Sequence, residues 1–216
     1  MTDTRAFYGQ WAPIYDRLAS LPVVADWRES AAEALELDPG DTVVEMGTGT
    51  GANVPALRDR VGAGGHVVGV DLTAEMLARA RGHDDRTGDG VHYARGDASQ
   101  PLVRDVDAVL ATFVVGLFAD PAAVVDRWCD CVSPGGRVAL LNFQRSPALL
   151  ATPANAAFEL FVRLSAPGKR LSTRSHADAF EQRVAAARKR LTERTVERRS
   201  ETFAGGYLGL VSGRVE

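Results

Sequence analysis

The chain of 216 residues is 45% hydrophobic and 25% charged, with a formal net charge of -3, which is ordinary for a globular protein. Such a composition is not that of a disordered or low-complexity chain, and the length favours one domain with one sizeable core. The N-terminus lacks the cationic start and apolar core of a signal peptide, and no window approaches the roughly 18 apolar residues of a membrane span. We therefore expect a cytoplasmic protein.

Two helical segments are predicted before the first strand, because apolar residues recur there at helical spacing. The first, which Pro13 interrupts, carries Phe7, Trp11, Ile14 and Leu18. The second carries Val24, Trp27, Ala31 and Leu35. We expect these helices to cover the sheet or to lie over the functional site.

Short β-branched runs alternate with helical patterns between residues 42 and 141, which is the order of βαβ units and of a parallel sheet. Thr73 and Asp120 are predicted to cap helices, and the helix after Asp120 is expected to end at Pro134-Gly135-Gly136. The predicted strands are residues 42–46, 66–70, 91–94, 108–112 and 137–141.

The alternation weakens after residue 141. A mostly apolar stretch, residues 148–164, is broken at Pro167-Gly168-Lys169, and a helix is predicted from Ser175 onward. Two further strands, near residues 195–203 and 207–211, would complete the sheet with an antiparallel edge. The sequence therefore predicts an α/β fold: a Rossmann-like, doubly wound, seven-stranded sheet, mostly parallel, with helices on both faces.

Residues that often bind metals or act as bases form no cluster in this sequence. Cys129 and Cys131 lie two apart in a predicted helix, where they could not easily bridge, and we interpret them as incidental thiols rather than metal ligands. His92 and His176 have no identified partner, so neither is assigned a catalytic role. A metal-free reaction is expected, and the catalytic residue is unknown.

Charge is distributed unevenly along the chain. Residues 160–200 contain 11 Lys and Arg against 4 Asp and Glu. This basic stretch could contact an anionic substrate or act as a peripheral membrane contact, and a solvated arginine-rich helix is the alternative that we favour.

A glycine-rich turn follows the first strand in Val43-Val44-Glu45-Met46-Gly47-Thr48-Gly49-Thr50-Gly51. Glycines let the backbone turn sharply and approach a ligand without a Cβ in the way. Because Gly47, Gly49 and Ala52 also satisfy the dinucleotide pattern G-x-G-x-x-G/A, the turn alone does not decide the cofactor. Asp71, at the end of the second strand, could accept both hydroxyls of a ribose and indicates a nucleoside more than a reaction.

Motifs further along the chain separate the cofactor classes. Gly96-Asp97-Ala98 follows the third strand, where a carboxylate could accept from an adenine amino group, and Thr112 ends the fourth. Pro134-Gly135-Gly136 introduces the fifth. With the glycine turn and Asp71, this order and spacing resembles the class I S-adenosylmethionine-dependent methyltransferases. The similarity is nearest to the ubiquinone/menaquinone C-methyltransferase group and the related phospholipid N-methyltransferases. It covers about residues 7–143, through the runs Trp11-Ala12-Pro13-Ile14-Tyr15-Asp16, Gly49-Thr50-Gly51-Ala52-Asn53-Val54-Pro55 and Asp71-Leu72-Thr73-Ala74-Glu75-Met76-Leu77.

The resemblance implies S-adenosyl-L-methionine as cofactor, with its methionine portion close to the glycine turn. Glu45 would orient the amino group of the methionine portion, and Thr112 would border that portion on one side. The alternatives are that Glu45 is a paired structural carboxylate and that Thr112 is an ordinary strand end. The turn residues implied in binding are Gly47, Thr48, Gly49, Thr50 and Gly51.

The same resemblance implies an adenosine site on the next two strands. Asp71 would hold the ribose, Leu72 would pack on the adenine, and Asp97 with Ala98 would contact the adenine edge. We treat residues 1–216 as one methyltransferase domain. Its parts are N-terminal helices over the site (1–40), a cofactor-binding core (41–143), and a variable acceptor region with the last strands (144–216).

The methyl acceptor is not identified by the sequence. A small or lipid-like acceptor is expected, methylated by direct in-line displacement, with the N-terminal helices and the stretch after residue 143 forming its pocket. Four aromatic residues, which could equally be core, are candidates to contact it: Tyr8, Trp11, Tyr15 and Phe143. Neither the methylated atom nor the oligomeric state is predicted.

Three alternatives remain open at this stage. A nucleic-acid methyltransferase is disfavoured, because position 112 begins Thr-Phe-Val-Val instead of the Asn/Asp-Pro-Pro-aromatic signature of base methylation. A cofactor-binding regulator without catalysis is the second alternative. A nicotinamide-dependent dehydrogenase is the third, disfavoured by Gly96-Asp97-Ala98.

Overall fold

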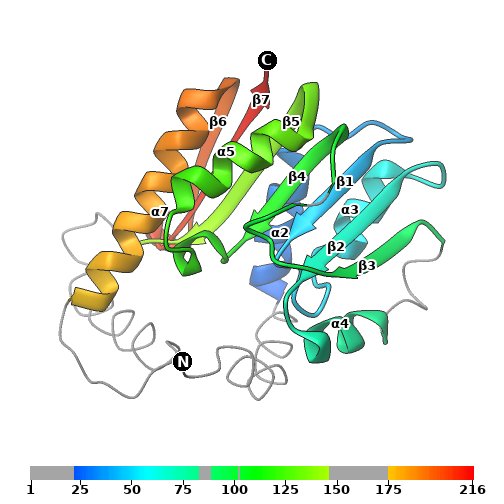
Figure 1. Cartoon of the computed structure of the whole chain (residues 1–216), viewed down its shortest axis with the longest axis horizontal. Coiled ribbons are helices and arrows are strands. Elements are labelled where there is room, and N and C mark those ends of the chain that lie inside the picture. The colour runs from blue at the N-terminus through cyan, green and yellow to red at the C-terminus, as the bar shows by residue number, and fades with distance from the viewer. Residues whose placement is uncertain (1–21, 83–88, 102, 146–174) are drawn as a thin grey trace.

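The computed structural model describes residues 22–82, 89–101, 103–145 and 175–216 (Figure 1). A mixed sheet lies at its centre, with strand order β3-β2-β1-β4-β5-β7-β6. The strands are β1 (Thr42–Met46), β2 (His66–Asp71), β3 (Val91–Arg95), β4 (Val106–Thr112), β5 (Val132–Phe143), β6 (Thr195–Phe203) and β7 (Leu208–Val215). The ladder from β3 to β5 is parallel, whereas β7 is antiparallel to both β5 and β6. The predicted Rossmann-like fold class is confirmed.

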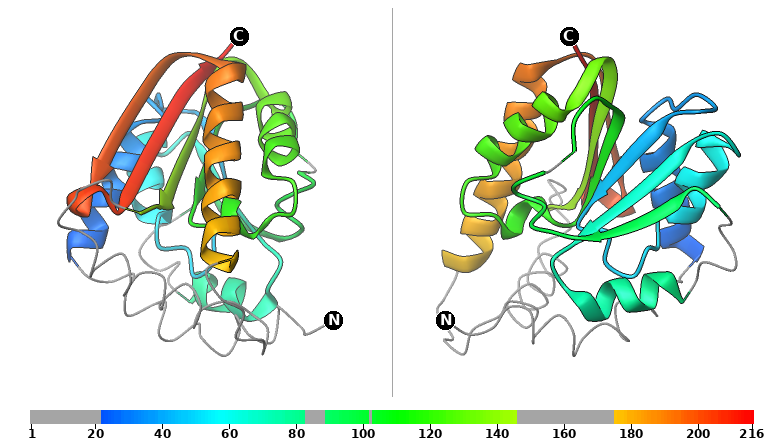
Figure 2. Two further views of the ribbon diagram at one scale, coloured as in Figure 1. Left: turned by 90° about the vertical axis from the view of Figure 1, so that its left-hand side faces the viewer. Right: turned by 45° about the vertical axis from the view of Figure 1, so that its right-hand side comes forward.

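Helices cover both faces of this sheet, with α5 and α7 on one face and α2 and α3 on the other (Figure 2). The α-helices are α2 (Pro22–Glu33), α3 (Val54–Val61), α4 (Ala74–Arg81), α5 (Pro121–Cys131) and α7 (Ser175–Arg194). Two short 3-10 helices also occur: η2 (Val115–Leu117) lies between β4 and α5, and η4 (Ala204–Gly206) lies between β6 and β7. None of the helices in the described part of the chain is long and apolar enough to cross a membrane.

A separate apolar core lies under each helical layer. The positions expected to face inward on α5 and α7 do so: Val124, Val125, Trp128, Val184, Ala187 and Leu191 are buried, and Phe180 packs against them. Val132, which was predicted to lie on the helix, is buried as the first residue of β5. The opposite core contains Ala31 and Leu35, which follow the predicted N-terminal pattern, together with Leu57 and Leu110. Strand residues alternate between the two cores, because successive side chains of a strand point to opposite faces.

The fifth strand begins earlier than the sequence predicts. Helix α5 ends at Cys131, and Pro134-Gly135-Gly136 lies inside β5 instead of ending the helix. Pairing with β4 jumps from Val132 to Arg137 there, so the extra residues form a bulge. Gly135 has a φ of 92°, and a Cβ on Gly136 would collide with the carbonyl of Asp107. Glycine is therefore used here to let a strand bulge rather than to end a helix.

The strand order reverses between β1 and β4. Both strands are parallel and neighbours, and the chain leaves β1 toward β2 and leaves β4 toward β5. Ligands of open α/β sheets bind beyond the carboxyl ends of the strands at such a reversal. The fold therefore places the glycine turn after β1 and Thr112 at the end of β4 on one ligand-binding edge.

Candidate functional site

The glycine turn after β1 depends on three left-handed glycines. Gly47, Gly49 and Gly51 have φ values of 78°, 57° and 77°, which other L-residues rarely adopt. The backbone N–H groups of Gly47 and Thr48 both donate to the carbonyl of Val70, at 2.8 and 3.0 Å, which fixes the turn against β2. A Cβ on Gly49 would meet no atom of the described residues within 4 Å, so none of them covers the tip of the turn. A ligand could approach the backbone there.

Glu45 lies fully buried beneath this turn and receives two side-chain hydrogen bonds. Thr48 Oγ1 donates to its Oε2 at 2.6 Å, and Asn53 Nδ2 donates to its Oε1. Asn53 Nδ2 also donates to Thr112 Oγ1 at 3.0 Å. Thr48 is thus bonded to Glu45 directly, and Asn53 joins Glu45 to Thr112.

Asn53 was not predicted as a site residue. It stands at the N-cap position of α3, and Asn is common there, but its side chain makes no capping bond because it turns to Glu45. That position was the one local signal that could have found it.

Burial dominates the protonation of Glu45. Desolvation raises the pKa of the Glu45 carboxyl to about 6, although the hydrogen bonds from Thr48 and Asn53 and the charge of Arg28 oppose the increase. Arg28, on α2, is half-buried, and desolvation lowers its pKa. Glu45 therefore keeps a negative charge at neutral pH in a place where charge is costly, and a cationic amino group beside it would be stabilised.

Asp71, at the end of β2, holds two backbone groups together. Its Oδ2 accepts from the N–H of Gly49 at 2.9 Å, and its Oδ1 accepts from the N–H of Thr73 at 2.8 Å. The carboxylate thus ties the glycine turn to the start of α4. Each carboxylate oxygen can accept a second hydrogen bond, so Asp71 could also accept from ribose hydroxyls.

The predicted adenine contacts lie at the ends of β2 and β3. Leu72 is 38% exposed and offers an uncovered apolar surface. Asp97 is exposed, and its Oδ1 accepts from the N–H of Ser99 at 2.9 Å. Ala98 is buried, and its carbonyl accepts from Trp128 Nε1 at 2.7 Å, so α5 holds this segment in place.

An aromatic pair lies at the ends of β4 and β5. The rings of Phe113 and Phe143 are stacked, with centroids 4.6 Å apart and an interplanar angle of 30°. Phe113 has a φ of 60°, which is rare for a bulky residue. Phe113 and its neighbour Thr112 therefore both face the α2/α3 side of the sheet, whereas the usual alternation of side chains along a strand would place them on opposite faces. Phe143 was a predicted acceptor contact, and Phe113 was missed because its backbone conformation has no local sequence signal.

The remaining predicted or considered residues add nothing to this arrangement among the described ones. Tyr8, Trp11, Tyr15 and the side chain of His176 fall outside the described residues. His92 is exposed on β3, with its ring centroid 5.5 Å from that of His66.

The two cysteines are free and buried on α5. Burial raises the pKa of Cys129 to about 12 and that of Cys131 to about 11, so both thiols stay protonated. Among the described residues, no three His, Cys, Asp or Glu side chains gather as metal ligands would.

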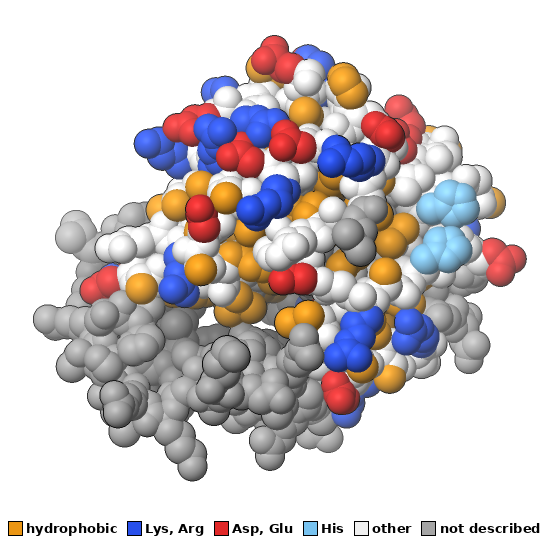
Figure 3. All heavy atoms as spheres, in the orientation of Figure 1, with side chains coloured by type: hydrophobic (Ala, Val, Ile, Leu, Met, Phe, Trp, Pro, Cys, Tyr) orange, Lys and Arg blue, Asp and Glu red, His pale blue; other side chains and the backbone are white. Residues whose placement is uncertain are grey.

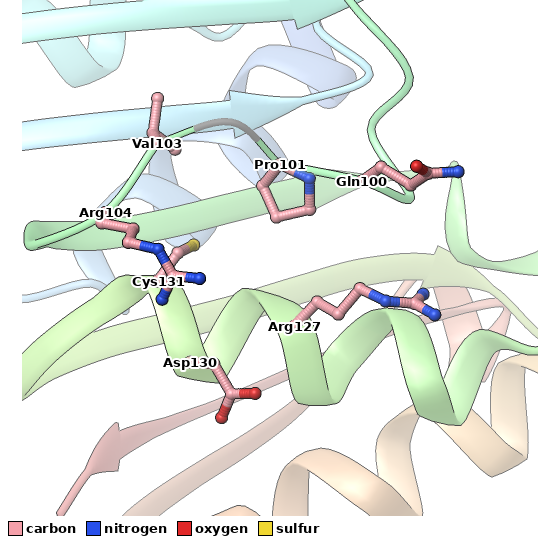
Figure 4. Close-up of a pocket in the computed structure, with 7 residues that line it drawn as sticks. All are labelled: Gln100, Pro101, Val103, Arg104, Arg127, Asp130 and Cys131. Atoms are coloured by element: carbon pink, nitrogen blue, oxygen red, sulfur yellow. The ribbon is translucent and has the colours of Figure 1, made fainter.

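A cavity of about 340 Å³ lies between α5 and the segment that precedes β4 (Figure 4). Gln100, Pro101, Val103, Arg104, Arg127, Asp130 and Cys131 line it. None of these is a predicted site residue, and the last three come from the C-terminal half of α5, whose end leads into the start of β5. The α5 end of the cavity lies near the amino end of β5, whereas Gln100, whose N–H donates to the carbonyl of Asp97 at 2.9 Å, places its other end next to the segment that follows β3.

Comparisons with known proteins agree with this geometry. Residues 44–140 match the family model described as a methyltransferase domain. The chain is 31% identical to 2-phytyl-1,4-naphtoquinone methyltransferase of Thermosynechococcus vestitus, over 74% of this chain and 70% of that protein. It is 28% identical to demethylmenaquinone methyltransferase of Clavibacter sepedonicus, over 82% and 71%. An arsenite methyltransferase of Halobacterium salinarum is 35% identical, but the match spans 47% of this chain and only 27% of that relative's length.

Solved structures share the fold. A phosphoethanolamine N-methyltransferase of Haemonchus contortus superposes with a TM-score of 0.71 at 15% identity, over the whole chain and 60% of that structure. A methyltransferase of Aquifex aeolicus superposes with a TM-score of 0.62 at 18% identity, over 95% of this chain and 98% of that one. The fold and the glycine turn thus define a Rossmann-like methyltransferase. The chain belongs to the class I S-adenosylmethionine-dependent methyltransferases, and S-adenosyl-L-methionine is the methyl donor of that family.

Proposed function

We propose that this protein transfers the methyl group of S-adenosylmethionine to a small, largely apolar acceptor with a flat ring, by direct in-line displacement. The sulfonium of the bound cofactor already makes the methyl group electrophilic. The chain must then chiefly hold the acceptor atom in line, and such positioning can lower a barrier by roughly 7 to 11 kcal/mol. A dedicated catalytic side chain is not required unless the acceptor must first lose a proton.

The cofactor's place is supported by what borders the glycine turn. The open space over Gly49 leaves room for a methionine portion, and the buried charge of Glu45 would attract its amino group. Asp71 retains free acceptor positions for a ribose, and the exposed face of Leu72 suits an adenine ring. We assign these four residues to the cofactor on that basis.

The aromatic pair is the observation that carries the proposed acceptor class. Phe113 follows Thr112 directly, and Phe143 ends the neighbouring strand. Both rings therefore lie at the carboxyl edge of the sheet, next to the place where a methyl donor would bind over β1 and β4. Stacked aromatic rings favour a further flat apolar group by contact and by quadrupole geometry. Two of the relatives are named for naphthoquinone and menaquinone substrates, which supports a quinol-type acceptor over a soluble polar metabolite.

The first experiment is calorimetric titration with S-adenosylmethionine and S-adenosylhomocysteine. Micromolar binding is expected for the native protein and loss of binding for Asp71→Ala. Because Asp71 also anchors Gly49, Asp71→Asn is tested beside it; this variant keeps one acceptor oxygen and should bind more weakly than native but measurably. Absence of binding to either compound would contradict the proposal.

The acceptor class is tested by turnover with a demethylated naphthoquinol and with phosphoethanolamine. Turnover of the quinol is expected, and Phe143→Leu should raise its KM without changing the affinity for S-adenosylhomocysteine. Phe118→Leu is the matched control, because Phe118 packs edge-on against Trp128 in the opposite core. Equal KM changes in both variants, or turnover of phosphoethanolamine alone, would refute the aromatic acceptor.

The basic stretch has a structural use that argues against a membrane role. Arg190 and Arg194 on α7 both pair with Asp126 on α5, at 2.8 and 2.6 Å, and positive and negative side chains interleave over these helices (Figure 3). We infer that this surface is a paired helical face. Lys189, whose side chain is 79% exposed, is the residue to neutralise when testing liposome sedimentation, since Lys189→Gln leaves the α5 pairs intact.

A further inference from the structure

Asn142 is the next-to-last residue of β5, and its amide has no hydrogen-bond partner in the described part of the chain. The residue is 1% exposed, and neither Nδ2 nor Oδ1 forms a hydrogen bond. Burying an amide without a partner costs free energy, and native structures rarely keep one unless a ligand or an ordered water satisfies it. The position at the carboxyl end of β5, beside β4, is the edge where the candidate site lies.

A positive group lies next to this amide. In the antiparallel ladder Asn142 is opposite Gly209 of β7, and paired side chains of a sheet begin about 5 Å apart. A Cβ on Gly209 would lie 2.6 Å from Arg188 Nη1 and 2.5 Å from Gln144 Oε1. The guanidinium of Arg188 therefore occupies the space over Gly209, on the same face of the sheet as Asn142.

Arg188 differs from the arginines of this region that pair with acids. Its guanidinium donates to the neutral Gln144 amide, and desolvation lowers its pKa with no opposing charge. Arg190 and Arg194, on the same helix, pair with Asp126, and Arg145 pairs with Asp178 and Glu181. Among the described residues, none of the carboxylates forms an ion pair with Arg188. A half-buried positive charge thus stands beside an unsatisfied amide.

We propose that Arg188 and Asn142 form an oxyanion subsite that binds an acidic oxygen group of the methyl acceptor. This inference rests on the proposed function, because the subsite would orient the same acceptor from the α7 side of the sheet edge. The guanidinium and the Asn142 amide supply several N–H donors, which suit two oxygens of a carboxylate or phosphate. Gly209 is needed because a side chain there would displace the guanidinium.

The test measures binding of three small probes to protein saturated with S-adenosylhomocysteine. Benzoate and phenyl phosphate carry the two oxyanions, and benzamide is the neutral control. Benzoate or phenyl phosphate is expected to bind, with the stronger of the two identifying the acidic group, and benzamide is expected to bind at least tenfold more weakly.

Three variants then assign the subsite. Arg188→Gln and Asn142→Leu should each weaken oxyanion binding by about tenfold or more, whereas Lys189→Gln, which removes a charge one residue away, should not. Asn142→Leu should also leave the melting temperature unchanged or higher, since it removes an amide that lacks partners. A lower melting temperature with unchanged probe affinity would assign Asn142 a structural role and overturn the proposal.

Failure of this proposal differs from failure of the proposed function. Equal affinity for benzoate and benzamide, with normal binding of S-adenosylhomocysteine, would refute the subsite alone. If the native protein does not bind S-adenosylhomocysteine at all, the proposed function is refuted instead. Equal loss of probe binding in Lys189→Gln and Arg188→Gln would also overturn the subsite, because it would indicate a diffuse charge effect.

Discussion

Glu45 is the residue whose replacement tests the site most sharply, because its charge opposes folding. The variant Glu45→Gln keeps the shape of the side chain and removes the buried negative charge. Gln can still accept one of the two hydrogen bonds that Thr48 and Asn53 donate, and the Thr48 hydroxyl can rotate to accept from the new amide. The variant should therefore fold.

The expected stability change follows from the pKa of the buried carboxyl. It rises from 4.5 to about 6 in the folded protein, so the folded state binds the proton more tightly than the unfolded chain. Stability from this group is complete below pH 4.5 and is lost as the pH rises to about 6. The loss is about 2 kcal/mol, since one pKa unit corresponds to about 1.4 kcal/mol. This figure already includes the favourable charge of Arg28.

Chemical denaturation of both proteins from pH 4 to pH 8, with titration of S-adenosylhomocysteine, measures the effect. The native protein should lose stability between pH 4.5 and 6, and Glu45→Gln should not. At pH 7 the variant should be as stable as the native protein or up to about 2 kcal/mol more stable, while binding the ligand more weakly. A variant that is less stable at every pH, or that keeps the pH dependence, would refute the reasoning.

Further predictions concern the surroundings of the site. Trp128→Phe should lower the free energy of unfolding by about 1 to 3 kcal/mol in urea, because the buried carbonyl of Ala98 loses its donor; an unchanged midpoint would contradict this. Gly51→Ala should be more destabilising than Gly49→Ala in thermal melts: both strain a left-handed residue, but only at Gly51 would the Cβ meet atoms, the nearest at 3.0 Å. Desolvation raises the pKa of Asp126, but its hydrogen bonds to two α7 arginines lower that pKa on balance. Asp126→Asn should therefore lower the free energy of unfolding by up to about 1 kcal/mol at pH 7, and by progressively less as the pH falls below 3.8. An equal loss at all pH values would exclude the ion pairs as its cause.

The sequence predicted the conformation of those parts of the candidate site that are local in the chain. A strand followed by Gly47, Gly49 and Gly51 requires left-handed turns whatever surrounds it, and these glycines do have positive φ values. Asp71 follows a β-branched strand, so the alternation of strand and helix was enough to place it at the sheet edge. Inward positions of α5 and α7 followed from helical spacing, because burial of one helix face repeats every 3.6 residues.

Sequence patterns located β5 less well. Pro134-Gly135-Gly136 is a normal end signal for a helix, and the same residues also suit a bulge. The pairing of Val132 with Val106 of β4 already makes this segment part of the strand, so the residues form a bulge and not a helix end. Hydrogen bonding between distant strands therefore overrode the local signal.

Only the tertiary structure brought together the side chains of the candidate site and of the proposed subsite. Asn53 reaches Thr112 across 59 residues of sequence, and Arg188 reaches Gln144 across 44, because β1, β4, β5 and α7 meet at one sheet edge. Side-chain burial, which raises the pKa of Glu45 and leaves Asn142 without partners, depends on what packs from other elements. The sequence determined the family and the glycine turn, since both depend on local sequence motifs and on the backbone conformations that they require. Long-range packing decided which side chains share the site, because sheet order and register alone set the distances between them.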